Sequence, residues 1–235
     1  MELTSGLVCR QLTFRWPKRD SAVPPVLDEV EAHFPTGAIT LVTGKTGAGK
    51  STLLHLLAGL LRPASGEVWA DGEPVSRWRT DHLDRWRRNV GIVFQHLAVV
   101  SDLSAGENVL LPLIPRGIGW LQMEHDVGRE LGEAGLADLI HTPASELSGG
   151  QRQRLAIARA LVIRPRFILA DEPTAFQDNE MTRRIISRLA DAARQGAVVV
   201  ISSHDPRLRE SGAIGRRFHL TEGKLTPTDS GENDP

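Results

Sequence analysis

The apolar residues of this chain gather in short runs that are typical of β-strands. Alternating or short runs cover Leu7–Phe14 and Val26–Phe34, and uninterrupted runs rich in branched residues cover Ile39–Val42, Phe167–Ala170 and Ala197–Ser202. A half-buried strand alternates apolar and polar positions, whereas a strand buried on both faces can be apolar throughout. The uninterrupted runs therefore predict strands of a parallel sheet that is covered on both faces.

Helical periodicity follows the first of these buried strands. The spacing i, i+3, i+4, i+7, which defines one face of a helix, is occupied by Leu53, Leu56, Leu57 and Leu60. Buried strands that alternate with amphipathic helices are typical of α/β proteins. We therefore predict the α/β class.

One segment, from about residue 96 to residue 162, breaks this alternation. Its pattern is helical throughout, with no convincing strand, and it is punctuated by Pro112, Pro115, Gly117 and Pro143. We expect a helical subdomain that is inserted into the α/β core.

The rest of the chain then divides into a core and a tail. We expect about 1–95 and 163–225 to form the core of a single domain, 1–225. Residues 226–235 are polar and acidic, and they cannot bury enough apolar area to offset the entropy lost on ordering. We expect this tail to be disordered.

The composition describes an ordinary globular protein. Of the 235 residues, 40% are hydrophobic and 24% are charged, which excludes a disordered, collagen-like or fibrous chain. The 28 Lys and Arg residues are balanced by 29 Asp and Glu residues, for a formal net charge of -1. No global field attracts nucleic acid or an anionic membrane, so any phosphate binding must be local.

The number of cysteines and the length of the apolar runs indicate in which cellular compartment the chain is expected. Cys9 is the only cysteine, so the fold does not rely on an intrachain disulfide, and a cytosolic setting is the default expectation. The longest apolar stretch, Leu53–Leu61, is far shorter than the ~20 residues that span a bilayer. The segment Met1–Ser5 lacks the features of a secretory signal. A membrane role is therefore expected to come through a partner.

A glycine-rich loop joins the strand Ile39–Val42 to the predicted helix. It matches the phosphate-binding pattern G-x-x-x-x-G-K-[ST] and consists of Gly44, Lys45, Thr46, Gly47, Ala48, Gly49, Lys50 and Ser51. Its glycines let backbone N–H groups turn toward phosphates, and the helix N-terminus adds about half a positive charge. Lys50 is suited to the β- and γ-phosphate oxygens and Ser51 to Mg²⁺. A plain glycine turn is the alternative, which the strand before and the helix after disfavour.

Two adjacent carboxylates, Asp171 and Glu172, end the buried strand that begins at Phe167. Open α/β sheets bind ligands at the carboxyl ends of their strands. Asp171 suits an outer-sphere, water-mediated role toward Mg²⁺, and Glu172 suits a group that orients or deprotonates an attacking water. A solvated strand terminus is the alternative.

A second glycine motif precedes the helical run Arg152–Val162, and it consists of Ser148, Gly149, Gly150 and Gln151. Ser148 can cap that helix, and the two glycines leave the first amides uncovered, which makes a second anion site. On spacing alone, a plain serine-capped helix explains the same residues.

Leu147–Gln151, placed between the phosphate loop and the acidic strand, resembles the signature motif of ABC ATPases. The other motifs of that family have matches in the same order. Gln95 resembles the Q-loop glutamine, Asp178 the D-loop aspartate and His204 the switch histidine. Trp16 stands where the family places the aromatic residue that stacks on adenine. Each has an ordinary structural alternative, but their order favours the functional interpretation.

The resemblance implies a RecA-like P-loop core with an antiparallel N-terminal β region and an inserted helical subdomain. It implies ATP and Mg²⁺ as ligands, which the phosphate loop and the following residue Thr52 would bind. In a head-to-tail homodimer, the signature motif and Asp178 of the second chain would contact the same ATP. Glu172, His204 and Gln95 would be catalytic, and Ser51, Gln95 and Asp171 would face the metal. The implied partner is a transmembrane permease subunit, which places the chain peripherally on the cytoplasmic face of the membrane.

Finer features resemble the branch of lipoprotein-release, macrolide-export and cell-division ATPases. They are the phrases Gly91–Gln95, Glu107–Leu113 and Leu169–Thr174. Where that branch usually has Gly-Asn-Leu-Asp, this chain has the segment Ala175–Asp178, with polar Gln177 in place of leucine. We expect this departure to affect how the D-loop packs across a dimer.

Other functions remain open on the sequence. An ATPase that moves a membrane protein without transport shares every motif, whereas a non-transport ABC ATPase would be expected to carry a coiled-coil insertion or a second cassette. Arginine and tryptophan interleave at Arg77–Arg79 and Arg85–Arg88, which suits single-stranded nucleic acid. An amphipathic helix leading into a Val90–Phe94 strand explains the same residues, and we expect no nucleic-acid partner.

Overall fold

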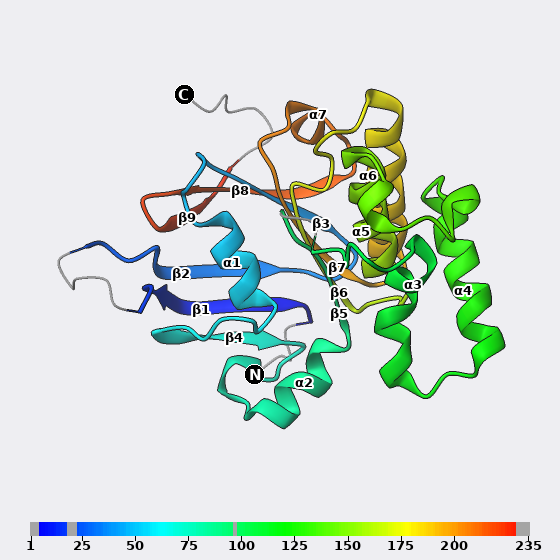
Figure 1. The fold of residues 1–235 in the computed structure, drawn as a ribbon. Helices are drawn as coiled ribbons and strands as arrows, with labels where there is room; N and C mark the ends of the chain where they lie inside the picture. The colour runs from blue at the N-terminus through cyan, green and yellow to red at the C-terminus, as the bar shows by residue number, and fades with distance from the viewer. Residues whose placement is uncertain (1–4, 18–22, 96–97, 229–235) are drawn as a thin grey trace.

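The computed structural model describes residues 5–17, 23–95 and 98–228. Its strands form two sheets (Figure 1). The six-stranded sheet has the order β5-β6-β7-β3-β8-β9 and consists of Val90–Val93, Phe167–Asp171, Val198–Ser202, Ile39–Thr43, Ile214–Thr221 and Lys224–Pro227. The three-stranded sheet has the order β2-β1-β4 and consists of Leu27–Phe34, Leu7–Phe14 and Ser65–Ala70.

Helices cover and connect these sheets. The α-helices are α1 (Lys50–Leu57), α2 (Thr80–Arg87), α3 (Ala105–Leu110), α4 (Trp120–Glu133), α5 (Gly149–Leu161), α6 (Asn179–Arg194) and α7 (Pro206–Arg209). Short 3-10 helices are η1 (Val75–Arg77), η2 (Leu111–Arg116), η3 (Ala137–Leu139) and η4 (Ala144–Glu146). This confirms the predicted α/β class.

The large sheet is parallel except at its last strand. β5, β6, β7, β3 and β8 run in one direction, and β9 pairs antiparallel with β8. Every residue of β3, β6 and β7 is buried, as their uninterrupted apolar runs predict. Because these strands are parallel and adjacent, the loops that follow them emerge at one edge of the sheet.

The small sheet is antiparallel and joins the large one through a shared apolar core. Phe34, at the end of β2, is fully buried, and its ring centroid lies 5.8 Å from that of Phe218 on β8. The same cluster of buried side chains includes Leu7 and Leu12 of β1 and Leu53 of α1. The phosphate loop is therefore supported from both sheets.

The helices α3, α4 and α5 form a helical group beside the parallel sheet (Figure 1), and α5 also packs against that sheet. They share an apolar core that contains Leu113, Leu131, Leu136 and Leu155. Within residues 98–162 the elements are helices only, as the pattern predicts; residues 96 and 97 lie outside the described part of the chain. Ser104 and Glu107 form a reciprocal capping box that begins α3.

The arginine- and tryptophan-rich stretch forms the predicted amphipathic helix, α2, followed by β5. Trp86 is buried, and its ring centroid lies 5.7 Å from that of Phe167 at the start of β6. Trp86 therefore packs in the core, and its indole face is not available to stack on a base.

Three details of the sequence interpretation were wrong. The helix after the phosphate loop ends at Leu57, and Leu60, placed on its buried face, is 40% exposed. The strands β4, β8 and β9 were not predicted. Thr226 and Pro227, assigned to the tail, belong to β9, where Thr226 pairs with His219. The expected disorder of 229–235 falls outside the described residues.

No helix among the described residues is both long enough and apolar enough to cross a membrane.

We expect Phe34→Ala to destabilise the protein by about 3–5 kcal/mol, because the substitution leaves a cavity where the two sheets meet. Urea unfolding measures this change. The control is Phe176→Ala, since Phe176 is 79% exposed and its removal creates no cavity. Equal midpoints for both variants would contradict the assigned role of Phe34.

Candidate functional site

The phosphate loop is shaped by glycines that no other residue replaces. Gly44 has φ of 143°, and a Cβ atom there would lie 2.3 Å from the carbonyl oxygen of Leu220. Gly49 is the N-cap of α1, with φ of 107° and no side-chain cap. The first amides of α1 therefore have no capping side chain and are presented toward the loop, as an anion site requires.

Lys50 lies inside this loop and is nearly buried, with 9% of its surface exposed. Its Nζ donates hydrogen bonds to the carbonyl oxygens of Gly44 at 2.7 Å and of Lys45 at 3.1 Å. The loop thereby fixes one ammonium group at its centre, beside the uncapped amides of α1.

A cavity of about 330 Å³ opens above the loop. Most of the residues predicted to hold nucleotide and metal meet there, although they come from five separate segments. The lining consists of Trp16, Val26, Thr46, Gly47, Gly49, Lys50, Ser51, Thr52, Gln95, Asp171, Glu172 and His204. Gly44, Lys45 and Ala48 complete the loop outside that lining.

Trp16 stands at the rim of this cavity, after the end of β1. Its ring meets that of Phe14 edge to face, with centroids 5.0 Å apart, and it is 41% exposed. The contact with buried Phe14 holds the indole in place, while much of the ring stays accessible. Such a ring offers a flat apolar surface for a heterocycle.

The acidic pair is positioned by the parallel pairing of β6 with β7. Asp171 pairs with Ser202, and the Ser202 hydroxyl donates to Asp171 Oδ1. One residue further on, the Ser203 hydroxyl donates to Glu172 Oε2 at 2.7 Å. Both carboxylates are buried, with exposures of 5% and 9%, so these hydrogen bonds offset part of the cost of their desolvation.

His204 meets the same carboxylate. Its backbone N–H donates to Glu172 Oε1 at 3.2 Å, and its Nδ1 lies 2.6 Å from that oxygen. The imidazole side chain is 79% exposed, so its other nitrogen remains accessible from the cavity. Glu172 itself has φ of 50°, which turns the chain sharply after the strand.

The oxygen atoms of Ser51, Gln95 and Asp171 line one cavity. A hydroxyl, an amide and a carboxylate are ligands that Mg²⁺ accepts, alongside water and phosphate oxygens. These residues therefore fit a magnesium ion bound together with a phosphate chain.

The second glycine motif does not reach this cavity. Ser148 caps α5, accepting from Gln151 N–H at 3.2 Å, while Gln151 Oε1 accepts from Ser148 N–H at 2.7 Å. The predicted capping by Ser148 is confirmed. A Cβ atom on Gly149 would meet nothing within 4 Å, so the start of α5 is open to an approaching surface.

Asp178 and Gln177 lie against that helix start. Asp178 caps α6 by accepting from Met181 N–H at 2.7 Å. Gln177 Nε2 donates to the carbonyl oxygen of Gly150 at 3.0 Å. Gln177, the residue that differs from the usual leucine, thus links its own segment, Ala175–Asp178, to the start of α5 in the same chain.

A supporting network beside the D-loop was missed by the sequence interpretation. The Thr174 hydroxyl donates to Asp205 at 2.7 Å, and Arg207 pairs with Asp205 and donates to the Gln177 carbonyl at 3.1 Å. Burial raises the pKa of Asp205, but hydrogen bonds from Arg207 and Thr174 outweigh it and hold that pKa below its usual value. No local sequence pattern marks these residues, because the contact joins the segment after β6 to the segment after β7.

Known proteins resemble this chain over most of its length. A family profile described as ABC transporter matches residues 27–175. The uncharacterized ABC transporter ATP-binding protein YknY of Bacillus subtilis is 36% identical over 88% of this chain and 90% of its own. The lipoprotein-releasing system ATP-binding protein LolD 2 of Rhodopirellula baltica is 37% identical over 88% of this chain and 84% of its own. The cell division ATP-binding protein FtsE of Escherichia coli is 36% identical over 85% of this chain and 89% of its own.

Solved structures agree with these relatives. The ATP-binding cassette MJ0796, as a dimer in a post-hydrolysis state bound to ADP and Pi, superposes with a TM-score of 0.88 at 29% identity. The match covers 97% of this chain and 100% of that one. A second dimeric structure of MJ0796 gives a TM-score of 0.89.

We expect Gln177→Leu to leave ATP affinity unchanged, because Gln177 does not line the nucleotide cavity. The substitution removes a hydrogen bond worth ~0.5–1.5 kcal/mol that prearranges the D-loop, so half-maximal turnover should require roughly 2- to 10-fold more protein. ATPase rates across a protein-concentration series measure this shift. Gln122→Leu, on α4, is the control; superimposable curves for all three proteins would show that the tie is neutral.

Proposed function

This chain belongs to the ABC transporter family as an ATP-binding, ATP-hydrolysing subunit, and from that premise we propose that two copies close head to tail around two ATP molecules to drive a transmembrane partner. The observation that carries the proposal is the separation of the two anion sites. The phosphate loop lines the nucleotide cavity, whereas Ser148 and Gly149 open onto the surface elsewhere in the same chain.

Each site is incomplete alone. The phosphate loop supplies Lys50 and helix amides on one side of a triphosphate, and its cavity is open on the other. The amides at the start of α5 are suited to phosphate, but none of the residues at that helix start lines the cavity that holds Lys50 and Trp16. In a head-to-tail pair, Ser148 to Gln151 and Asp178 of one chain cover the cavity of the other, and the dimeric cassettes of similar fold support this arrangement.

We assign Glu172 as the group that orients and activates the attacking water. Its carboxylate is held by Ser203 and His204, so it reaches the cavity in a fixed orientation and requires little reorganisation. His204 has its second ring nitrogen free to donate to a γ-phosphate oxygen. Gln95, at the end of β5, faces both the phosphate and the metal.

Ser51, Gln95 and Asp171 would hold Mg²⁺, which when bound neutralises charge on the phosphate oxygens. The protein groups do the rest of the positioning: Lys50 binds the phosphate chain, and Trp16 stacks on adenine at the rim.

We assign the transmembrane partner to the face beside Gln95 and the helical group. Large apolar side chains of the inserted helical segment lie exposed on η2 and α4 and just before α3: Val100, Leu111, Ile114, Trp120 and Leu121. An exposed apolar surface of this kind suits a protein contact. A permease subunit that presents a cytoplasmic helix to it would hold the chain on the cytoplasmic face of the membrane.

We expect Trp16→Ala to weaken ATP binding by roughly 5- to 150-fold, because stacking on a base contributes ~1–3 kcal/mol. Turnover at saturating ATP should change little, since the contact is the same in the ground and transition states. Titration with ATP and GTP measures both affinity and base selectivity. Trp120→Ala is the control, and unchanged affinity in the Trp16 variant would remove Trp16 from the site.

We expect Glu172→Gln to lower turnover by roughly 10²- to 10⁴-fold, or about 3–5 kcal/mol, while ATP binding stays intact. Blocked hydrolysis should trap ATP between two chains, so this variant should be a dimer in ATP and a monomer without nucleotide. Light scattering after size exclusion measures the mass, and the exposed Glu124→Gln is the control for turnover.

Adding Ser148→Arg to that variant separates the two sites. The larger side chain should fill the partner-facing surface at the start of α5 and abolish the ATP-dependent dimer, while nucleotide affinity of the monomer is retained. A Glu172→Gln variant that stays monomeric at high concentration, or a double variant that still dimerises, would refute the head-to-tail arrangement.

A further inference from the structure

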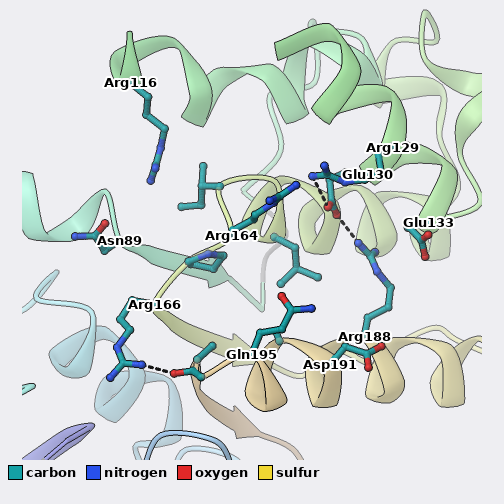
Figure 2. A pocket seen from close by; sticks show the side chains of 16 residues that line it. Asn89, Arg116, Arg129, Glu130, Glu133, Arg164, Arg166, Arg188, Asp191 and Gln195 are labelled. Carbon is teal, nitrogen blue, oxygen red and sulfur yellow. Dashed lines mark hydrogen bonds and ion pairs between the residues drawn. The ribbon is translucent and has the colours of Figure 1, made fainter. Parts of the chain in front are cut away.

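A second cavity, of about 790 Å³, lies at the opposite end of the parallel sheet from the nucleotide cavity. Figure 2 shows the side chains that line it. It is lined at the amino ends of β5 and β6 by Asn89 and by Arg164–Arg166. The end of η2, helix α4 and helix α6 form its other walls. This volume is in the range of small-molecule sites.

Arginine dominates the lining. Its charged residues are Arg116, Arg129, Arg164, Arg166, Arg188, Glu130, Glu133 and Asp191. In Figure 2 the acidic Glu133 and Asp191 lie on the side away from Arg116 and Arg166. The positive charge is therefore concentrated at one end of the cavity.

Several of these arginines are already neutralised. Arg129 and Arg188 both pair with Glu130, which comes from α4. Arg166 pairs with Asp71 at 2.9 Å and also donates to the Gly196 carbonyl. These contacts hold the walls of the cavity together and fix the directions of the side chains.

Arg116 has no carboxylate partner among the described residues. It donates to the carbonyl oxygen of Arg88, and its Nε is buried without a hydrogen-bond partner. Burial and the nearby charge of Arg88 both lower the pKa of Arg116. A buried guanidinium N–H that lacks an acceptor is costly unless an external group supplies one.

Arg164 is the second weakly paired cation. Its nearest carboxylate is Asp126, at 4.0 Å, and its side chain is 73% exposed. The residue has φ of 45°, so the chain turns sharply there before entering β6. In Figure 2 its side chain extends from the segment before β6 over the cavity, toward Arg129 and Glu130 of α4.

We propose that this cavity binds a small molecule carrying phosphate groups, held by Arg116 and Arg164 and oriented by the amides of Asn89 and Gln195. Guanidinium groups bind phosphate through paired N–H donors, and a multiply charged anion balances two cations at once. A lone carboxylate would leave one of the two cations unpaired.

The site goes beyond the nucleotide chemistry proposed above, and it shares no lining residue with the nucleotide cavity. Arg116 belongs to the helical group, whereas Asn89 and Arg164 adjoin the sheet. A bound anion would therefore link the helical group to the sheet at a point remote from ATP.

Isothermal titration of the full chain with tripolyphosphate tests the site. ADP is present throughout at one equivalent, so that the phosphate loop is filled while little free ADP competes for the second cavity. We expect tripolyphosphate to bind the parent chain and Arg116→Gln/Arg164→Gln to weaken that binding by about tenfold or more. Arg85→Gln/Arg183→Gln removes the same charge from exposed sites and should bind within about twofold of the parent.

Phosphate groups occur both on soluble molecules and on lipid headgroups, and a second measurement distinguishes them. Sedimentation with vesicles of phosphatidylcholine, with and without phosphatidic acid, is compared for the same proteins. Retention that needs phosphatidic acid and is lost in Arg116→Gln/Arg164→Gln identifies a lipid headgroup. Tripolyphosphate binding without such retention identifies a soluble ligand.

The proposal fails if tripolyphosphate does not bind the ADP-saturated parent, or if both double variants bind it equally. ATP turnover without tripolyphosphate is measured in parallel and should equal the parent rate in both variants. A chain that binds tripolyphosphate through Arg116 and Arg164 but does not hydrolyse ATP would retain this site and refute the ATPase function separately.

Discussion

The parallel pairing of β6 with β7 is the constraint on which the catalytic centre depends. Asp171 and Ser202 are paired in register, so the two chain segments that leave the sheet there begin side by side. Glu172 and the segment Ser203–His204 meet only because of that register. A shift of one residue would turn these side chains to the opposite face of the sheet and separate the carboxylate from its histidine.

The same constraint makes two buried carboxylates tolerable. Asp171 and Glu172 lie almost out of contact with solvent, and an ionised carboxylate in such a place is costly unless hydrogen bonds are directed at it. The last residue of β7 and the loop that follows it supply those donors, from two hydroxyl groups and a backbone N–H. The pairing of β6 with β7 therefore both buries the two carboxylates and places the hydrogen-bond donors that stabilise them.

The sequence interpretation succeeded where burial leaves a continuous signal. β3, β6 and β7 are buried throughout and read as apolar runs, and the phosphate loop and the cap Ser148 have local patterns. β4 and β8 were missed because they are only partly buried, and β8 carries Arg216 and Arg217. The hydrogen bonds from Gln177 to Gly150 and from Arg116 to the Arg88 carbonyl join residues far apart in the chain. Such contacts depend on the fold as a whole and leave no local pattern.

Helix α5 connects three features that are otherwise separate. Its first turn carries the open glycines and accepts the hydrogen bond from Gln177, and Gln153 donates to the Glu172 carbonyl at 3.2 Å. Its last residue, Leu161, lines the arginine cavity. At ~1.5 Å per residue a helix of this length spans about 20 Å, so its two ends lie near different sites. A second chain that contacts the glycines and an anion that contacts Arg164 would therefore both act on the position of this one helix, from opposite ends.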